Sequence, residues 1–176
     1  MSIHEQITKL EAANKLYCLE SLLTGEDTVR TLWVSSDVEA AVTPPYALGR
    51  NPNERERLRE FRQFLDSFLE HGHLSVAQNP DDKPDFAMLA RVKPVGKEFW
   101  DLRITAPQPG IRALGAFADF NTFVVLSWEF REKITSFDDE VQNCIDCWEE
   151  FFGNISPFKT DQLSKYLSEF TEYEHA

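Results

Sequence analysis

Three arginines within one predicted antiparallel meander are the residues of this chain best suited to chemistry. Arg103, Arg112 and Arg131 lie in three strand-like runs that are separated by two turn signals. Guanidinium groups are planar and can donate two parallel hydrogen bonds to a phosphate or a carboxylate. If the strand register places the three arginines on one face, the pattern predicts an anion or phosphate site. The alternative is ordinary cross-strand ion pairing on a solvated sheet face.

The meander is predicted over residues 99–133, with strands at about 99–105, 111–118 and 122–131. Ala-Pro-Gln-Pro-Gly follows the first run and Asp-Phe-Asn the second, and such short connections favour antiparallel neighbours. Alternation separates an apolar face from a polar one. The expected buried face comprises Trp100, Leu102, Ile104, Ile111, Ala113, Gly115, Phe117, Val124, Leu126, Trp128 and Phe130. The expected polar face comprises Asp101, Arg103, Arg112, Ser127, Glu129 and Arg131.

Composition limits the classes of protein to which the chain can belong. A length of 176 residues with 42% hydrophobic residues suits one domain with a real core. No apolar run reaches the roughly 18 residues of a membrane helix, and residues 1–15 lack the apolar region of a signal peptide, so we expect a cytoplasmic protein. The net charge of −12 argues against general nucleic-acid binding. Residues 86–137 are nevertheless net basic, which leaves room for a local phosphate site.

The elements around the meander are expected to be mainly helical. Apolar periodicity predicts helices over residues 3–23, 37–42, 51–71, 138–152 and 159–173. A strand is predicted over 28–35, with apolar residues on both of its faces. In the 51–71 helix, Asn51 is a good N-cap and Glu54 suits a capping box. Its arginines alternate with glutamates, which favours a solvated and self-paired helix face.

Cysteine and histidine pairs in the chain are interpreted as structural. Cys144 and Cys147 have the spacing of redox and zinc sites, but they lie in the middle of a predicted helix among acidic residues, which raises thiol pKa values. His71 and His73 could supply two metal ligands, but no third ligand accompanies them. We therefore expect no metal and no cofactor.

From Met88 to Phe152 the sequence resembles the RelE-like toxin superfamily, especially its HigB-like and phage-protein branches. The segments that carry the resemblance are MLARVKPVGKEFWDLRI, Gly110-Ile111-Arg112, FVVLSWEFREK and the helix from Asp138 to Trp148. The resemblance implies an α+β fold: an antiparallel three- to four-stranded twisted sheet with helices packed on one face, plus N- and C-terminal helices. We expect one domain over residues 1–176, with a toxin-like core at about 28–152 and helical extensions at 1–25 and 157–173.

The resemblance also implies a function and a set of site residues. Active members of the superfamily cleave mRNA at the ribosome without a metal, by activating a ribose 2′-hydroxyl against the adjacent phosphate. By position, Arg103, Arg112 and Arg131 are the expected catalytic residues. Lys133, Ser127 and Asp101 are expected to bind substrate. The implied partners are an antitoxin protein and the mRNA on the ribosome, and the terminal helices could form a homo-oligomer.

Two other functions stay open at this point. One is a non-catalytic interaction protein of phage or mobile-element origin that uses the same fold to bind another protein. The other is a small-ligand-binding domain lined by tryptophans, of which the chain has four.

Overall fold

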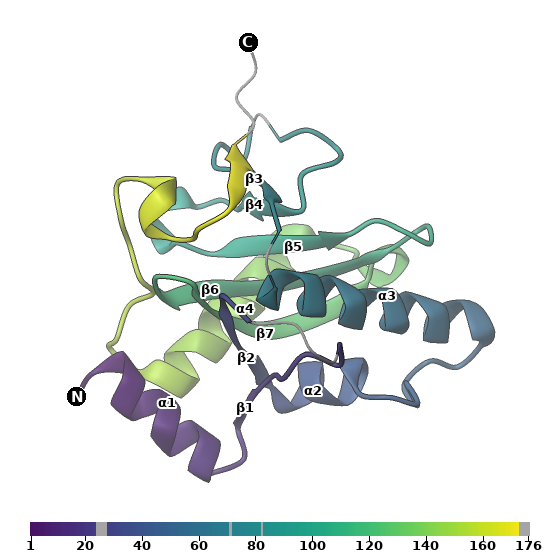
Figure 1. Ribbon diagram of the computed structural model, residues 1–176, viewed down its shortest axis with the longest axis horizontal. Coiled ribbons are helices and arrows are strands. Elements are labelled where there is room, and N and C mark those ends of the chain that lie inside the picture. Colours follow the sequence, from purple (N-terminus) through teal and green to yellow (C-terminus); the bar gives the residue numbers. More distant parts are fainter. Residues whose placement is uncertain (24–27, 71, 82, 173–176) are drawn as a thin grey trace.

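One mixed β-sheet is the centre of the computed structural model, which describes residues 1–23, 28–70, 72–81 and 83–172. The eight strands of these residues follow the order β1-β2-β7-β6-β5-β4-β3-β8 (Figure 1). The strands are β1 (Leu16–Cys18), β2 (Thr31–Ser35), β3 (Leu74–Ala77), β4 (Leu89–Arg91), β5 (Trp100–Ile104), β6 (Ile111–Asp119), β7 (Thr122–Phe130) and β8 (Phe170–Glu172). The α-helices are α1 (Ile3–Ala12), α2 (Ser36–Val42), α3 (Pro52–Leu69) and α4 (Phe137–Phe152). Across these residues, no helix combines the length and apolar character that crossing a membrane requires.

The predicted meander is confirmed as the middle of this sheet. β5 pairs with β6 and β6 with β7, both antiparallel. Gly110 closes the first connection with a φ of +85°, and a Cβ there would lie 2.4 Å from the carbonyl oxygen of Ile104. Only glycine can adopt this φ and lie this close to the Ile104 carbonyl group without strain. The glycine that predicted a turn in the sequence is therefore required there for steric reasons.

The expected three- to four-stranded antiparallel sheet is wrong, because the meander is extended on both sides. β2 joins β7 in parallel, and on the other side β3 pairs in parallel with both β4 and β8. The added strands β1, β3, β4 and β8 are only three or four residues long. Segments this short show little alternation, and their pairing depends on partners far away in the sequence.

Helices cover both faces of the sheet, not one. In Figure 1, α3 crosses in front of the sheet and α4 lies behind it. The first core joins α2, α3 and the segment after α4 to one face, and includes Leu58, Phe61, Phe68, Trp100, Phe117 and Tyr166. The second core joins α1 and α4 to the other face, and includes Ile7, Leu10, Leu114, Val124, Ile145 and Trp148. A sheet that is covered twice needs apolar residues on both sides, as the central strands have.

A bulge in β7 changes the expected faces of that strand. Leu114 pairs with Ser127 but the next residue, Gly115, pairs with Val125, so Leu126 has no partner on β6. Val124 and Leu126 therefore belong to the second core, whereas Trp128 and Phe130 pack against the first. The prediction that all four share a face is wrong, because one extra residue reverses the alternation beyond it.

The first predicted helix ends earlier than its apolar pattern suggested. Ser2 caps α1 in a reciprocal capping box with Glu5, but the helix stops at Ala12. Asn14 follows with a φ of +57°, a left-handed conformation that ends helices. Leu16 then enters β1, which pairs with β2. The apolar residues after Ala12 thus belong to a strand and its connection, and the predicted helix over 3–23 is wrong beyond that point.

The predicted C-terminal helix is also wrong, although its apolar residues are buried. Leu163, Tyr166 and Leu167 belong to the first core, but only a single 3₁₀ turn, Leu163–Lys165, forms there. Glu169 has a φ of +57°, and the chain then adds β8 to the edge of β3. The segment is part of the fold and not a helical extension, so it offers no terminal helix to an oligomer. Residue 173 lies outside the described residues.

The α3 helix forms as predicted, but two of its arginines are buried. Asn51 accepts a hydrogen bond from the Glu54 amide, while the Glu54 carboxylate accepts one from the Arg50 amide. Arg57 donates two hydrogen bonds of 2.7 Å to Glu132, which lies outside the helix. Arg62 pairs with Asp66, both under 9% exposed. The prediction of a solvated, self-paired face therefore fails for Arg57, whereas Arg62 is paired within the helix as predicted but is buried.

Candidate anion-binding site

The meander brings the three predicted arginines to one small pocket of about 280 Å³. Arg103 in β5 lies directly opposite Arg112 in β6, and Arg131 follows the end of β7. Residues that line this arginine pocket are Asp85, Arg103, Ile104, Thr105, Gln108, Pro109, Arg112 and Arg131. Three guanidinium groups and one carboxylate give its lining a net positive charge in a chain of net charge −12.

Arg103 is held rigidly beneath the pocket. Its Nη1 donates hydrogen bonds to the carbonyl oxygens of Pro84, at 2.7 Å, and Ala87, at 3.4 Å. Its Nε is buried and donates to no described residue. Burial lowers the pKa of Arg103, and the nearby Arg112 lowers it further. An anion in the pocket would offset that repulsion.

Asp101 lies under the arginines and is 1% exposed. Its Oδ2 accepts a 3.0 Å hydrogen bond from Arg112 and lies 4.0 Å from Arg103 Nε, while its Oδ1 accepts none from the described residues. Burial raises the pKa of Asp101, and attraction to Arg112, Lys83 and Arg103 opposes the rise. Asp101 does not line the pocket, so its geometry suits holding Arg112 in place better than contacting a ligand.

Two residues predicted to bind substrate lie elsewhere. Lys133 Nζ is 3.9 Å from a carboxylate oxygen of Glu54 and 4.8 Å from the ring centre of Phe130. Ser127 is half-buried, and its hydrogen bond to the Cys144 thiol places it beneath α4. Neither lines the arginine pocket. Ser127 pairs with Leu114 and therefore shares the face of Arg112, as predicted, but α4 covers that face at this point.

Residues from the loop before β4 complete this region, and the sequence pattern did not point to them. β4 pairs antiparallel with β5, so the chain that enters β4 reaches the end of β5 that carries Arg103. Asp85 lines the pocket, and Lys83 approaches Asp101 and lies 5.6 Å from the ring centre of Phe137. Burial lowers the pKa of Lys83. The only local signal was a lysine between acidic residues in a loop, which is common on surfaces.

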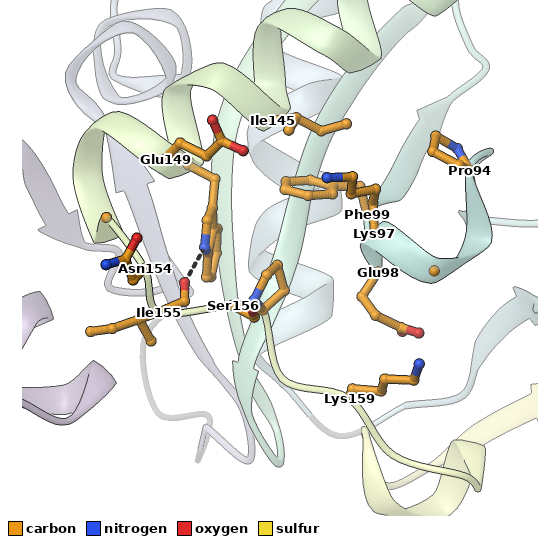
Figure 2. Close-up of a pocket in the computed structure, with 14 residues that line it drawn as sticks. Pro94, Lys97, Glu98, Phe99, Ile145, Glu149, Asn154, Ile155, Ser156 and Lys159 are labelled. Carbon is orange, nitrogen blue, oxygen red and sulfur yellow. Dashed lines mark hydrogen bonds between the residues drawn. The ribbon is translucent and has the colours of Figure 1, made fainter.

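A second and larger cavity, of about 880 Å³, lies at the opposite end of β5. Figure 2 shows it between the turn around Lys97 and the chain that follows α4. One of the four tryptophans, Trp148, lines it, whereas Trp100 is fully buried in the first core. The four tryptophans therefore do not gather around one cavity.

The cysteine pair has no activated thiol. Burial raises the pKa values of Cys144 and Cys147, for Cys147 to about 11. Both cysteines are free, and no group of three metal-ligating side chains occurs among the residues that the structure describes. Of the two histidines considered as metal ligands, His71 lies outside those residues. Burial, more than acidic neighbours, explains the pKa of these thiols.

We expect the three cysteines to differ sharply in reactivity. Cys18 is exposed on β1, Cys147 is half-buried and Cys144 is fully buried. A thiol-alkylating reagent at neutral pH should modify Cys18 first and Cys144 only after unfolding, because the thiolate and access to it control the rate. Mass spectrometry of the native protein over time measures this order. Rapid modification of Cys144 in the native state would contradict it.

Comparisons of the chain with protein-family models, with curated proteins and with solved structures gave no match.

Proposed function

We propose that this protein binds RNA by holding one backbone phosphate in the arginine pocket, and that it acts as an mRNA endoribonuclease of the toxin–antitoxin type. The observation that carries the proposal is the convergence of Arg103, Arg112 and Arg131 on one pocket. The family part of the proposal rests on the resemblance of the segments around the same arginines to RelE-like toxins. An antitoxin partner and a cytoplasmic location belong to the same proposal.

Unused donors support anion binding over simple ion pairing. Arg131 forms no ion pair with any described residue, and the hydrogen bonds that Arg103 donates to described residues go to the Pro84 and Ala87 carbonyl oxygens and not to a carboxylate. Arg112 does form an ion pair with Asp101, as the hypothesis of cross-strand ion pairing predicts. That pair involves only one of the three guanidinium groups, so the other two keep donors for an anion. A phosphate oxygen would accept from several of these donors at once, which suits the geometry of guanidinium groups.

The pocket suits a single phosphate group of a flexible strand. Its volume of about 280 Å³ lies near the lower end for ligand sites. Because the rest of the chain is acidic, a long duplex would meet repulsion away from the pocket. Proton transfer from a ribose hydroxyl would fall to Asp85, the carboxylate that lines the pocket, since arginine stays protonated.

Replacing Arg131 by alanine tests the proposal directly. We expect at least about tenfold weaker binding of a short single-stranded RNA, because one phosphate contact is lost and the fold is not affected at this exposed site. Fluorescence anisotropy at fixed salt measures the dissociation constant. Arg59→Ala is the matched control, because it removes the same charge from an exposed site on α3. Equal RNA affinity of the two variants, or no RNA binding by the wild type, would overturn the proposal.

Binding without cleavage is the second candidate function. It is favoured by the lining of the pocket, which among the described residues contains neither histidine nor tyrosine as a proton donor. Incubating the purified protein with labelled mRNA separates the two candidates. Loss of full-length mRNA that requires Arg112 supports the endoribonuclease. Intact mRNA together with Arg131-dependent binding supports the non-catalytic function.

A further inference from the structure

The turn that carries Arg131 is tied to α3 by a buried arginine. Arg57 is 3% exposed, and its guanidinium group donates two hydrogen bonds of 2.7 Å to the carboxylate of Glu132. Glu132 is the middle residue of the 3₁₀ turn Arg131–Lys133 and directly follows Arg131. A bidentate pair between a guanidinium group and a carboxylate fixes orientation as well as distance. The pair therefore fixes the backbone of this turn relative to α3.

The same guanidinium group also contacts the turn between β5 and β6. Arg57 Nη1 donates a 3.3 Å hydrogen bond to the Gly110 carbonyl oxygen, and the Arg131 amide donates to the same oxygen at 3.1 Å. Gly110 directly follows Gln108 and Pro109, which line the arginine pocket. One buried side chain thus joins the two turns that contribute Arg131 and Pro109 to the lining of that pocket.

Further contacts hold Arg57 and the residues around Arg131 in place. The guanidinium carbon of Arg57 lies 4.3 Å from the ring centre of Phe130, the last residue of β7, which is 2% exposed. The Lys133 ammonium lies 4.8 Å from the same ring centre and 3.9 Å from a carboxylate oxygen of Glu54. Residues on both sides of Arg131 are therefore bound to the body of the fold. The Arg131 side chain itself is exposed and forms no ion pair with any described residue.

We propose that Arg57 and Glu132 are positioning residues of the arginine pocket, and that their ion pair sets the position of Arg131 toward a bound phosphate. Neither residue lines the pocket, so both act through the turn and not by contact with the ligand. The inference rests on the proposed function, because it assigns a role in the same phosphate site. A group that is held in position before the ligand arrives loses less conformational entropy on binding. Hydrogen bonding to Arg57 lowers the pKa of Glu132, so the pair stays ionised at neutral pH.

Charge alone and positioning predict opposite effects of replacing Glu132. Removing a carboxylate from the residue next to Arg131 reduces repulsion of a phosphate, so by charge alone RNA should bind more tightly. If the pair positions Arg131, Glu132→Ala should instead weaken the binding of a short single-stranded RNA about fivefold or more, because the turn loses its fixed position. Glu132→Gln should lie between the wild type and Glu132→Ala, since its amide oxygen still accepts a hydrogen bond from Arg57.

Fluorescence anisotropy at fixed salt measures these affinities, and Glu60→Ala is the control. Glu60 lines a neighbouring hollow together with Arg103, and it forms no hydrogen bond or ion pair within the part of the chain that the structure describes. Glu60→Ala removes the same charge without altering the turn, so it should bind RNA at least as tightly as the wild type does. If Glu132→Ala fails to fold, as judged by circular dichroism, Glu132→Gln takes its place in both measurements.

Hydrogen–deuterium exchange of the Arg131 amide, followed by NMR without RNA, tests the positioning separately. In Glu132→Ala this exchange should be about tenfold faster than in the wild type, because the charge-assisted hydrogen bonds that hold the turn are lost. The Leu19 amide, which donates to the Leu32 carbonyl oxygen on β2, is the reference and should keep its rate.

The two measurements separate failure of the inference from failure of the proposed function. If the wild type does not bind RNA, the proposed function fails, and amide exchange decides whether the pair positions the turn. If the wild type binds RNA, the inference is overturned when Glu132→Ala binds it as tightly as Glu60→Ala does. Unchanged exchange of the Arg131 amide in Glu132→Ala overturns it as well.

Discussion

Replacing Arg30 by alanine is expected to lower the free energy of unfolding by about 3 kcal/mol or more, because several carbonyl groups lose a charged hydrogen-bond donor. Arg30 is 3% exposed, and its guanidinium donates to five carbonyl oxygens. They belong to Phe68, Glu70, Gly72, Ser168 and Glu169. One side chain thus ties the end of α3 to the segment before β8. Without it, these carbonyl groups lose partners in a place that water reaches poorly.

Urea unfolding followed by circular dichroism measures this loss. Arg30→Lys should fall between the wild type and Arg30→Ala, because an ammonium group has only three donors and lacks the planar fork. Arg59→Ala, at an exposed site, should change the free energy of unfolding by less than about 0.5 kcal/mol. A loss below about 1 kcal/mol for Arg30→Ala would mean that the carbonyl groups find other partners.

Replacing Gly115 by alanine is expected to cost about 3 kcal/mol or more, because the added methyl group has no room. Gly115 lies in β6 between Trp100 of β5 and Val125 of β7. A Cβ there would lie 1.9 Å from the Val124 carbonyl oxygen and 2.8 Å from a ring carbon of Phe123. The first neighbour is backbone and cannot rotate away, so β6 and β7 must separate locally beside the bulge.

Gly96→Ala is the matched control for this substitution. A Cβ at Gly96 meets no atom within 4 Å and its φ is not in the left-handed region, so we expect no loss of stability. Thermal unfolding of both variants measures the contrast, and near-ultraviolet circular dichroism reports on Trp100 packing. Similar melting temperatures for the two would show that the sheet adjusts at Gly115 without cost. The bulge would then be less rigidly determined than its geometry suggests.

Both substitutions act at places where the fold supports the two cavities. Gly115 lies three residues along β6 from Arg112, so separation of the strands should also disturb the arginine pocket. Arg30 anchors the segment that carries Tyr166, and Tyr166 holds Glu98 at the larger cavity. Of the two variants, Gly115→Ala should therefore also show weaker RNA binding, because the arginine pocket is the proposed RNA site.

Local patterns in the sequence predicted the parts of the fold that short-range physics controls. The meander followed from alternation and from turns such as the one at Gly110, where only glycine fits. Helix α3 followed from its cap at Asn51, and α4 from its apolar periodicity. The approach of Arg103 to Arg112 needed only the register of neighbouring strands, which a short connection strongly limits.

Contacts between distant segments decided the rest. The residues of β8 have the apolar pattern of an amphipathic helix, and the sequence therefore predicted a helix there. In the structure they form a strand, because β3 provides an edge to pair with and because Arg30 and Glu98 bind the chain that leads to it. Ser127 lies on the predicted face, but α4 covers that face there, and the bulge beside Gly115 places Val124 and Leu126 on the opposite face from Trp128 and Phe130. By itself the sequence determined which residues are apolar, where turns must occur and that three arginines are close along one meander. Only the tertiary structure decided which strands extend the sheet and which loops close the two cavities, because those pairings depend on partners tens of residues away and not on any local preference.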